Sequence, residues 1–450
     1  MKKREIIEGV IKDYDFPNKG SFELDGKKVI VKGALPGQKV SCMVSKVRKD
    51  KVEARLLDVL ERSEIEDAAP PCPQFGICGG CAYQTMSYEH QLELKAGQVK
   101  KLLDGVIDSE AHPYDWEGII GSPVTTAYRN KMEYSFGDEY KDGPLVLGLH
   151  KKNSMYDIVP VCNCVIVSED YNRIVSYTME FARAHGLSYH KKMQHVGLLR
   201  HLVLRQSKTN GGLLVNLVTS TDGLENLDLN AYVEGLLALP LDGTIVGILH
   251  TANDSLADAV VPEKVTLLYG RDYIEEEVLG LHFQISPFSF FQTNTKSAER
   301  LYSKAREYAG DTKDKLIFDL YSGTGTIAQM LAPVAKKVVG VEIVEEAVEA
   351  AKVNAKLNGL DNCEFIAGDV LKVVDELEDK PDFIVLDPPR DGIHPKAIQK
   401  IIDFGVEQMV YISCKPTSLA RDLEVFEAAG YKVKRATAVD QFPNTVHIES

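Results

Sequence analysis

The segment DLYSGTGTI at residues 319–327 decides the fold of the C-terminal third of the chain. It ends a hydrophobic run that starts at residue 315 and predicts a buried strand. The two glycines and the short apolar stretch after them predict a tight turn into a helix. A strand, a glycine turn and a helix form the opening unit of a doubly wound α/β sheet.

The residues downstream repeat this strand-and-helix pattern as far as the C-terminus. Runs of Val, Ile and Leu predict parallel strands whose two faces are both covered by helices. The predicted strands span residues 315–321, 337–341, 363–367, 381–386, 409–412, 431–439 and 446–448, and the predicted helices span residues 326–331, 345–357, 395–404 and 417–429. The sequence therefore predicts a doubly wound, mostly parallel sheet.

Ligands of such sheets bind at the carboxyl ends of the strands. Gly323 and Gly325 let the backbone approach a ligand there, and Glu342 ends the next strand, where an acid can hydrogen-bond ribose hydroxyls. Together with Ala328, the glycines also fit a dinucleotide fingerprint. An NAD-dependent oxidoreductase is therefore an alternative.

Three other acids favour S-adenosylmethionine over NAD as the cofactor. Asp319 precedes the turn, where it can meet a cationic methionyl amine, and Asp369 follows the third strand, where it can reach an adenine amino group. Asp387 begins the segment DPPR at residues 387–390, a stiff loop that suits a flat base. We therefore predict S-adenosylmethionine binding at this edge of the sheet.

A cysteine follows the strand predicted over residues 409–412. An isolated cysteine is more often a small buried hydrophobe than a catalytic group. Cys414, however, would lie at the ligand-binding edge, and Glu449 near the chain end supplies a carboxylate. A thiolate that adds to C6 of uracil makes C5 nucleophilic, and a base must later remove the C5 proton. The pair predicts a cysteine nucleophile and a glutamate base.

A second group of cysteines lies in the Pro/Gly-rich segment at residues 70–81. Cys72, Cys78 and Cys81 have the spacing C-x5-C-x2-C, and Cys162 and Cys164 are candidates for a fourth ligand. Such spacing in a chain without a secretion signal favours metal binding over disulfides. A zinc site, an iron–sulfur cluster and reduced thiols without metal all remain open.

The composition is that of a soluble globular protein of several domains. The chain has 450 residues, of which 44% are hydrophobic, and a net charge of −14. No apolar run approaches the ~18 residues of a membrane span, and the start MKKRE does not resemble a signal peptide. We expect a cytoplasmic protein with no membrane contact.

The first 60 residues differ from the rest in charge and pattern. They carry 14 Lys and Arg against 9 Asp and Glu, a net charge of +5 that suits contact with phosphate. Short alternating segments with Gly, Pro and Asn between them predict a small antiparallel barrel. The turn at residues 35–38, LPGQ, has the Pro and Gly of a type II turn.

A central α+β region is predicted between the barrel and the parallel sheet. Its predicted strands span residues 126–134, 145–150, 196–205 and 212–218, and its predicted helices span residues 87–103, 171–185 and 295–308. The domains predicted from these patterns are 1–60, 61–300 and 301–450.

These motifs together resemble the RNA (uracil-5-)-methyltransferase family with an N-terminal TRAM domain and an iron–sulfur cluster. The resemblance covers nearly the whole chain, from ALPGQ at residues 34–38 to the tail DQFPNTVHIE at residues 440–449. It implies an OB-like RNA-binding barrel, a central α+β domain and a Rossmann-like class I methyltransferase sheet. It also implies that Cys414 is the nucleophile and Glu449 the base.

The resemblance also assigns the remaining site residues. It places Gln292, Tyr321, Glu342 and Asp387 at S-adenosylmethionine, beside Gly323, Gly325 and Asp369. It assigns Cys72, Cys78 and Cys81 to a [4Fe–4S] cluster, with Cys164 favoured over Cys162 because an apolar pair follows it.

The implied substrate is large-subunit (23S) ribosomal RNA, since the compact tRNA enzymes lack the TRAM domain and the cluster. The T-loop uridine of tRNA is the alternative substrate, and no obligate protein partner is evident. A further alternative is an RNA-binding or iron–sulfur sensor protein with a degenerate catalytic domain.

Overall fold

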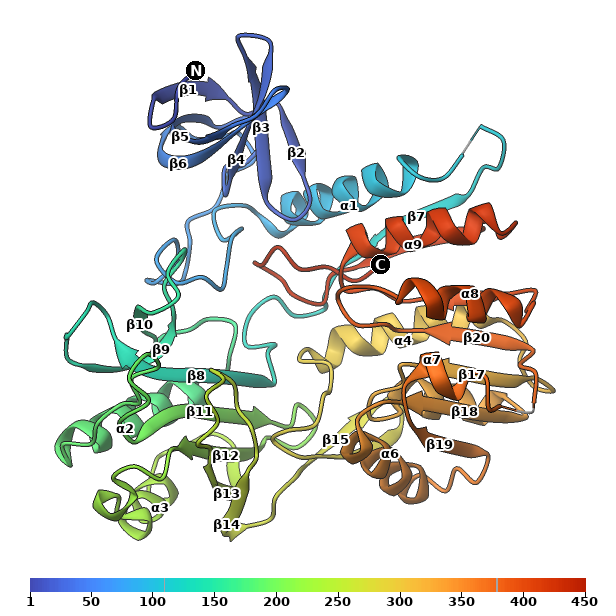
Figure 1. The fold of residues 1–450 in the computed structure, drawn as a ribbon. Helices are drawn as coiled ribbons and strands as arrows, with labels where there is room; N and C mark the ends of the chain where they lie inside the picture. The colour runs from blue at the N-terminus through green and yellow to red at the C-terminus, as the bar shows by residue number, and fades with distance from the viewer. Residues whose placement is uncertain (109, 378) are drawn as a thin grey trace.

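The computed structural model describes residues 1–108, 110–377 and 379–450. Figure 1 shows three sheets in three parts of the molecule, with helix α1 (Tyr88–Asp104) and the C-terminal tail between them. In the described residues no helix is both long and apolar enough to cross a membrane.

The N-terminal sheet has six strands in the order β1-β5-β6-β4-β3-β2. They are β1 (Ile6–Val10), β2 (Asp13–Asp15), β3 (Lys19–Leu24), β4 (Lys27–Lys32), β5 (Lys39–Val47) and β6 (Lys51–Glu61). β4 and β6 pair in parallel, so the sheet is mixed, whereas the sequence predicted an antiparallel barrel. The predicted type II turn is confirmed, since the Gln38 N–H donates to the Leu35 carbonyl at 3.2 Å and Gly37 has a φ of 85°.

The central sheet has seven strands in the order β10-β9-β8-β11-β12-β13-β14. They are β8 (Lys131–Asp138), β9 (Leu145–His150), β10 (Ile158–Pro160), β11 (Leu199–Gln206), β12 (Gly212–Thr219), β13 (Thr244–Ala252) and β14 (Lys264–Gly270), accompanied by α2 (Glu169–Ala184), η1 (Leu224–Asn226) and α3 (Leu229–Leu237). The strand predicted over residues 126–134 begins only at Lys131. Ala127 has a positive φ of 48°, which a strand does not allow, and the Arg129 N–H donates to the loop carbonyl of Ile166.

A hairpin and a helix connect the central sheet to the C-terminal sheet. The hairpin strands are β15 (Ile274–Val278) and β16 (Leu281–Ile285), and the helix is α4 (Thr295–Ala309). The Asn294 side chain caps α4 by accepting a hydrogen bond from the Ser297 N–H. The loop between β16 and α4 contains Gln292, which brings this predicted site residue to the edge of the C-terminal sheet.

The C-terminal sheet confirms the doubly wound prediction. Its parallel strands have the order β19-β18-β17-β20-β21. The elements are β17 (Leu316–Leu320), α5 (Thr326–Leu331), η2 (Ala332–Val334), β18 (Lys337–Glu342), α6 (Glu345–Leu357), β19 (Cys363–Ala367), α7 (Val370–Val373), β20 (Phe383–Leu386), α8 (Pro395–Asp403), β21 (Met409–Tyr411) and α9 (Pro416–Ala428). The strand order reverses between β17 and β20, which is where a ligand of such a sheet binds.

The last two predicted strands were wrong in part. β22 (Arg435–Val439) does not join the large sheet but pairs in parallel with β7 (Asp115–Ile120), a segment from the start of the central region. Residues 446–448 form no strand, and a single bridge joins Val439 to Glu449. The tail is held by single backbone and side-chain contacts with several segments, such as the Asn444 carbonyl with the N–H groups of Ala82 and Tyr83, and not by a continuous ladder.

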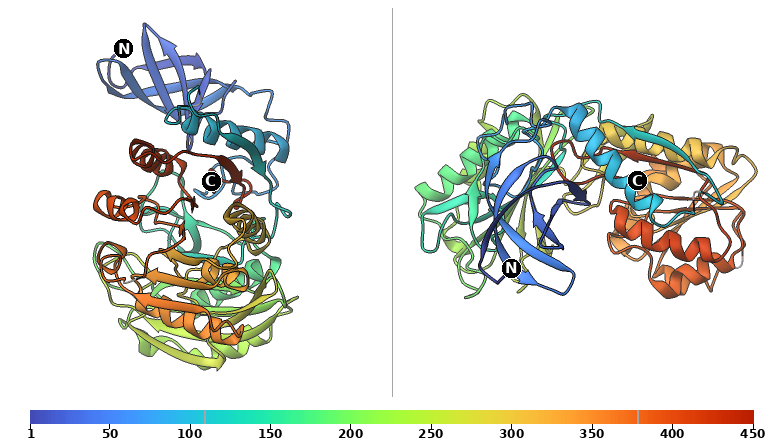
Figure 2. Two further views of the ribbon diagram at one scale, coloured as in Figure 1. Left: turned by 90° about the vertical axis from the view of Figure 1, so that its right-hand side faces the viewer. Right: turned by 90° about the horizontal axis from the view of Figure 1, so that it is seen from above.

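The N-terminal sheet contacts the rest of the molecule through α1 and the tail. Figure 2 shows this sheet on the far side of α1 from the large parallel sheet. Phe16 packs in one apolar cluster with Leu103 of α1, Leu419 of α9 and Ile448 of the tail. The tail therefore packs against the N-terminal sheet, α1 and α9.

Candidate active site

The turn after β17 forms the floor of the candidate site. Gly323 and Gly325 have φ values of 53° and 71°, which favour glycine, and Tyr321 also has a positive φ of 68°. A Cβ on Gly325 would lie 2.5 Å from the Phe365 ring, so no larger residue fits. The glycines therefore let the backbone bend sharply beneath a ligand, as the sequence predicted.

Two predicted cofactor residues are fixed by backbone hydrogen bonds, Glu342 to the turn itself and Asp369 at the start of α7. Glu342 accepts hydrogen bonds from the Gly323 N–H at 2.9 Å and from the Val344 N–H at 3.0 Å. Asp369 caps α7 by accepting from the Leu371 N–H at 3.0 Å. Both carboxylates are thus fixed at the carboxyl ends of their strands.

Two further acids lie at this edge of the sheet, the fully buried Asp319 and the partly buried Asp387. Asp319 accepts from the Ala328 N–H at 2.9 Å, while its Oδ1 has no partner among the described residues. Burial, together with the carboxylates of Asp387 and Glu342, raises the pKa of Asp319 to about 8. Burial also raises the pKa of Asp387 to about 7. Such a group of acids is suited to a positively charged ligand.

The structure places Gln292 beside a tyrosine that the sequence analysis missed. Burial, followed by the carboxylates of Asp387, Glu449 and Asp319, raises the pKa of Tyr302 far above its usual value, while a hydrogen bond with Gln292 opposes the rise. Tyr302 therefore lies among the acids of the site. Its position on the buried face of α4 made it indistinguishable in sequence from a core residue.

The chain end is held against β21 and β22. Val439 and Glu449 exchange two backbone hydrogen bonds of 2.8 and 3.0 Å, and Ser413 and Ser450 exchange two of 2.8 and 2.9 Å. The Glu449 residue is only 3% exposed. Backbone bonds to Val439 at the end of β22 and to Ser413 just after β21 therefore fix the position of Glu449.

Cys414, Glu449 and Arg390 lie close enough to affect one another. Burial and the charge of Glu449 raise the pKa of the Cys414 thiol to about 11, although the Arg390 guanidinium opposes the rise. Burial and Asp387 raise the pKa of Glu449 far above its usual value, and Arg390 again opposes. The sequence predicts Arg390 only as part of a stiff loop, because no local pattern places it beside the thiol.

The cysteines predicted to bind metal lie in one neighbourhood. Burial, together with the thiols of Cys164, Cys78 and Cys72, raises the pKa of Cys81 to about 12. The Gly80 N–H donates to the Cys78 Sγ at 3.4 Å. However, nowhere in residues 1–108, 110–377 and 379–450 do three or more His, Cys, Asp or Glu side chains form a group that could hold a metal ion.

Known proteins resemble this chain over its full length. A family described as tRNA (Uracil-5-)-methyltransferase matches residues 260–450. An RNA methyltransferase of Clostridium acetobutylicum is 49% identical over 451 residues, which cover 100% of this chain and 97% of the relative. Another from Caldanaerobacter subterraneus subsp. tengcongensis is 48% identical over 451 residues, with 100% and 98% covered.

A solved structure is similar to this fold. The structure of Pyrococcus abyssi tRNA (uracil-54, C5)-methyltransferase in complex with S-adenosyl-L-homocysteine has a TM-score of 0.74 and 26% identity, and 98% of each chain is covered. A doubly wound sheet with an acid-lined glycine turn, in a chain whose relatives carry this name, defines an S-adenosylmethionine-dependent RNA methyltransferase. The chain belongs to the RNA (uracil-5-)-methyltransferase family. The alternative of an NAD-dependent oxidoreductase is therefore wrong.

Proposed function

We propose that the protein methylates C5 of uridine in RNA with Cys414 as the nucleophile and Glu449 as the base. The observation that carries this proposal is the proximity of the two side chains beside the acid-lined turn. Neither residue would be needed by a protein that only binds RNA or senses iron–sulfur chemistry.

The residues of the site divide the reaction between them. S-adenosylmethionine supplies an electrophilic methyl group when bound. The Cys414 thiolate adds to C6 of uracil, which makes C5 nucleophilic towards that methyl group. Glu449 then removes the C5 proton, and the electron pair of the C5–H bond forms the C5–C6 double bond as the Cys414 sulfur leaves.

Arg390 favours the thiolate form of Cys414. Its positive charge and its hydrogen bond lower the thiol pKa, against burial and the charge of Glu449. Gln292, Tyr321, Gly323, Gly325, Glu342, Asp369 and Asp387 are the proposed cofactor-binding residues. The unpartnered Oδ1 of Asp319 fits the ammonium group of S-adenosylmethionine.

We assign the other two parts of the chain to RNA binding and to the cysteine site. Residues 1–60 would contact RNA through their positive charge, residues 61–300 would carry the cysteine loop, and residues 301–450 would carry catalysis. Cys72, Cys78, Cys81 and Cys164 would hold a [4Fe–4S] cluster, supported by the mutual influence of the four thiols. The thiols would have to move closer together around it. Iron and acid-labile sulfide in anaerobically purified protein would support the cluster, and a zinc-only or metal-free protein would exclude it.

The RNA substrate has two candidates. Large-subunit ribosomal RNA is preferred on the resemblance to enzymes with a TRAM domain and a cluster. The T-loop uridine of tRNA is the second candidate, because the P. abyssi tRNA enzyme covers 98% of this chain. A tRNA enzyme can therefore have a fold that matches this chain from end to end, so the length of the chain alone does not favour ribosomal RNA.

The test of the proposed activity uses RNA labelled with tritium at C5 of uridine. The protein and S-adenosylmethionine should release tritium and form 5-methyluridine, with ribosomal RNA and tRNA from a deletion strain offered separately. Mapping 5-methyluridine in total RNA of the deletion strain identifies the site. No tritium release from either RNA would favour a degenerate catalytic domain.

We expect S-adenosylmethionine to bind more tightly as the pH rises from about 6 to about 9. The cofactor is a cation at sulfur and needs ionised acids, yet Asp319 and Asp387 have pKa values of about 8 and about 7. Below the pKa of each acid that must lose a proton on binding, the affinity for S-adenosylmethionine should fall about tenfold for each pH unit that the pH is lowered. Calorimetry in buffers of different ionisation enthalpy should detect proton release on binding.

Asp319 and Asp387 should make the free protein less stable as the pH rises, although they make cofactor binding tighter. Between their ordinary pKa near 4 and their raised values, the folded protein holds protons that the unfolded chain has lost, so the free energy of unfolding of the free protein falls as the pH rises. Asp319→Asn should remove the part of this fall in the free energy of unfolding that extends up to about pH 8. S-adenosylhomocysteine has the same ammonium group, so its binding should also depend on pH through Asp319, and a pH-independent affinity of the wild type for both ligands would contradict the predicted pH dependence of binding.

A further inference from the structure

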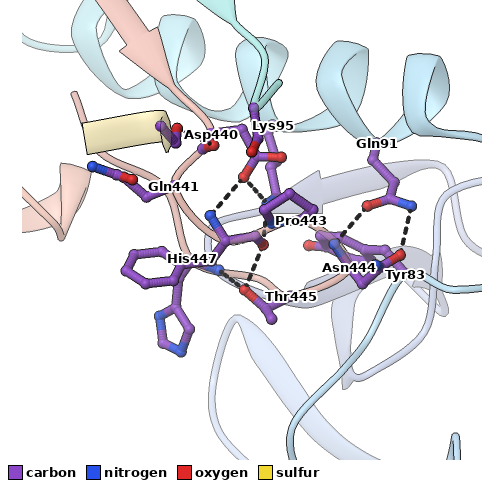
Figure 3. A network of polar contacts seen from close by, with 12 residues as sticks. Tyr83, Gln91, Lys95, Asp440, Gln441, Pro443, Asn444, Thr445 and His447 are labelled. Carbon is purple, nitrogen blue, oxygen red and sulfur yellow. Dashed lines mark hydrogen bonds and ion pairs between the residues drawn. The ribbon is translucent and has the colours of Figure 1, made fainter. Parts of the chain in front are cut away.

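A buried ion pair between α1 and the tail fixes the tail segment that carries Glu449. Its lysine, Lys95, lies more than 300 residues before Glu449 in the chain. The Lys95 Nζ of α1 lies 2.7 Å from the Asp440 Oδ1, and both side chains are completely buried. Lys95 also donates to the Phe442 carbonyl at 3.1 Å, and the Tyr88 hydroxyl donates to the other Asp440 oxygen at 3.0 Å. Figure 3 shows the ion pair within a larger network of polar contacts.

The same helix holds the tail at a second point, one turn from the first. The Gln91 Oε1 accepts from the Asn444 N–H at 2.8 Å, and its Nε2 donates to the Asn444 Oδ1 at 3.2 Å. Gln91 and Lys95 are four residues apart, so they lie on one face of α1 and reach the tail together (Figure 3). Asn444 itself has a positive φ of 69°, a backbone conformation that these bonds maintain.

Two segments outside α1 also hold this turn of the tail. The N–H groups of Ala82 and Tyr83 donate to the Asn444 carbonyl at 2.8 and 3.1 Å. The Tyr128 hydroxyl donates to the Pro443 carbonyl at 2.9 Å. The tail is therefore held between separate segments of the chain and does not depend on a strand of its own.

This network connects directly to the base. Asp440 follows Val439, and Val439 exchanges two backbone hydrogen bonds with Glu449. The Ser297 hydroxyl donates to the Asp440 carbonyl at 2.8 Å, which ties the same point to α4. A displacement of Asp440 would therefore move the residue that orients Glu449.

A buried ion pair is a costly way to join two segments. Desolvation of both charges offsets much of their attraction, and apolar side chains of similar size often stabilise a protein equally well. Two buried charges stabilise each other only when their side chains meet at one distance and orientation, whereas apolar side chains can pack in several ways. The retained charges thus point to a need for position, in addition to any contribution to stability.

We propose that Lys95 and Asp440 are positioning residues that hold Glu449 against C5 of the target uridine. This inference rests on the proposed function. The ion pair serves the step in which Glu449 removes the C5 proton, and the addition of the Cys414 sulfur to C6 does not require it. If the base is displaced, the C5–H bond stays intact, the sulfur cannot leave, and the methylated RNA stays attached to Cys414.

The main test is the double variant Lys95→Met/Asp440→Asn, which removes both charges. Lys95→Met alone leaves a buried carboxylate unpaired and is expected to fold poorly. The assay uses S-adenosylmethionine labelled in the methyl group and unmodified RNA. We expect turnover to fall about 100-fold, as for a base displaced by about 1 Å, and labelled RNA to accumulate in a complex with the protein that survives SDS.

A matched control separates positioning from stability. Asp170 is a buried carboxylate of α2 that accepts from the N–H groups of Asp242 and Gly243 at 2.8 and 2.9 Å. Asp170→Asn should lower the melting temperature without accumulating the labelled complex. Accumulation in both variants to the same extent would overturn the proposal.

Turnover and hydrogen exchange of the double variant give two further tests of the positioning role of Lys95 and Asp440. Wild-type turnover in the folded double variant, without a complex, would overturn the proposal. Hydrogen exchange at residues 438–450 should accelerate in the double variant, and unchanged exchange there would also overturn it. RNA with 5-fluorouridine, from which the base cannot remove a C5 proton, tests the proposed function separately. If the wild type forms no complex with that RNA, the proposed function is refuted, independently of the role of Lys95 and Asp440.

Discussion

Replacing Cys414 with alanine is expected to lower 5-methyluridine formation by about 10⁴-fold or more. Uracil C5 is a weak nucleophile, and without the sulfur at C6 the methyl group has no activated carbon to attack. Tritium release from uridine labelled at C5 and nucleoside mass spectrometry measure the loss. The same variant should form no covalent complex with RNA that contains 5-fluorouridine.

Cofactor binding should survive this change. The acids that we assign to S-adenosylmethionine, Asp319 and Asp387, are untouched, so the dissociation constant should stay within about twofold. Cys363→Ala is a matched control, because Cys363 is also a partly buried thiol of the parallel sheet. Its variant should keep full activity. Undiminished tritium release from Cys414→Ala would refute the mechanism.

Replacing Glu449 with glutamine is expected to stop the reaction after methyl transfer. The amide has nearly the shape of the carboxylate but cannot accept the C5 proton, so turnover should fall by about 10² to 10⁴-fold. Labelled methyl groups should then appear on RNA that stays bound to the protein through Cys414. Gel electrophoresis in SDS detects this complex.

The glutamine variant also has a predicted effect on the thiol. Since Glu449 raises the pKa of Cys414, its removal should lower that pKa and shift complex formation with 5-fluorouridine RNA to lower pH. Glu424→Gln, on the exposed surface of α9, is the control and should change neither property. A Glu449→Gln enzyme with normal turnover would assign the base to another residue.

Several elements of the C-terminal region could be predicted closely from sequence. The helices at residues 326–331 and 345–357 and the strand at residues 363–367 have the predicted bounds. Their patterns are local, since each of these elements forms from residues that are neighbours in the chain. Glycines with positive φ after β17 also follow from local backbone geometry.

Long-range pairing could not be predicted in the same way. Nothing near residues 431–439 indicates that β22 would pair with β7, more than 300 residues earlier, or that the tail would lack a strand. The strand predicted over residues 126–134 was placed too early because alternation in sequence does not reveal a residue with positive φ. Tyr302 and Arg390 were missed as site residues because their local patterns fit a core helix and a loop.

The sequence by itself determined the parallel sheet, the glycine turn and the types of side chain that S-adenosylmethionine and uracil chemistry require. Those features depend on neighbouring residues in the chain. Only the tertiary structure decided that Glu449, one residue from the chain end, lies beside Cys414. That position depends on Lys95, Gln91 and Val439, whose hydrogen bonds and charges act across hundreds of residues and satisfy polar groups that burial would otherwise leave unpaired.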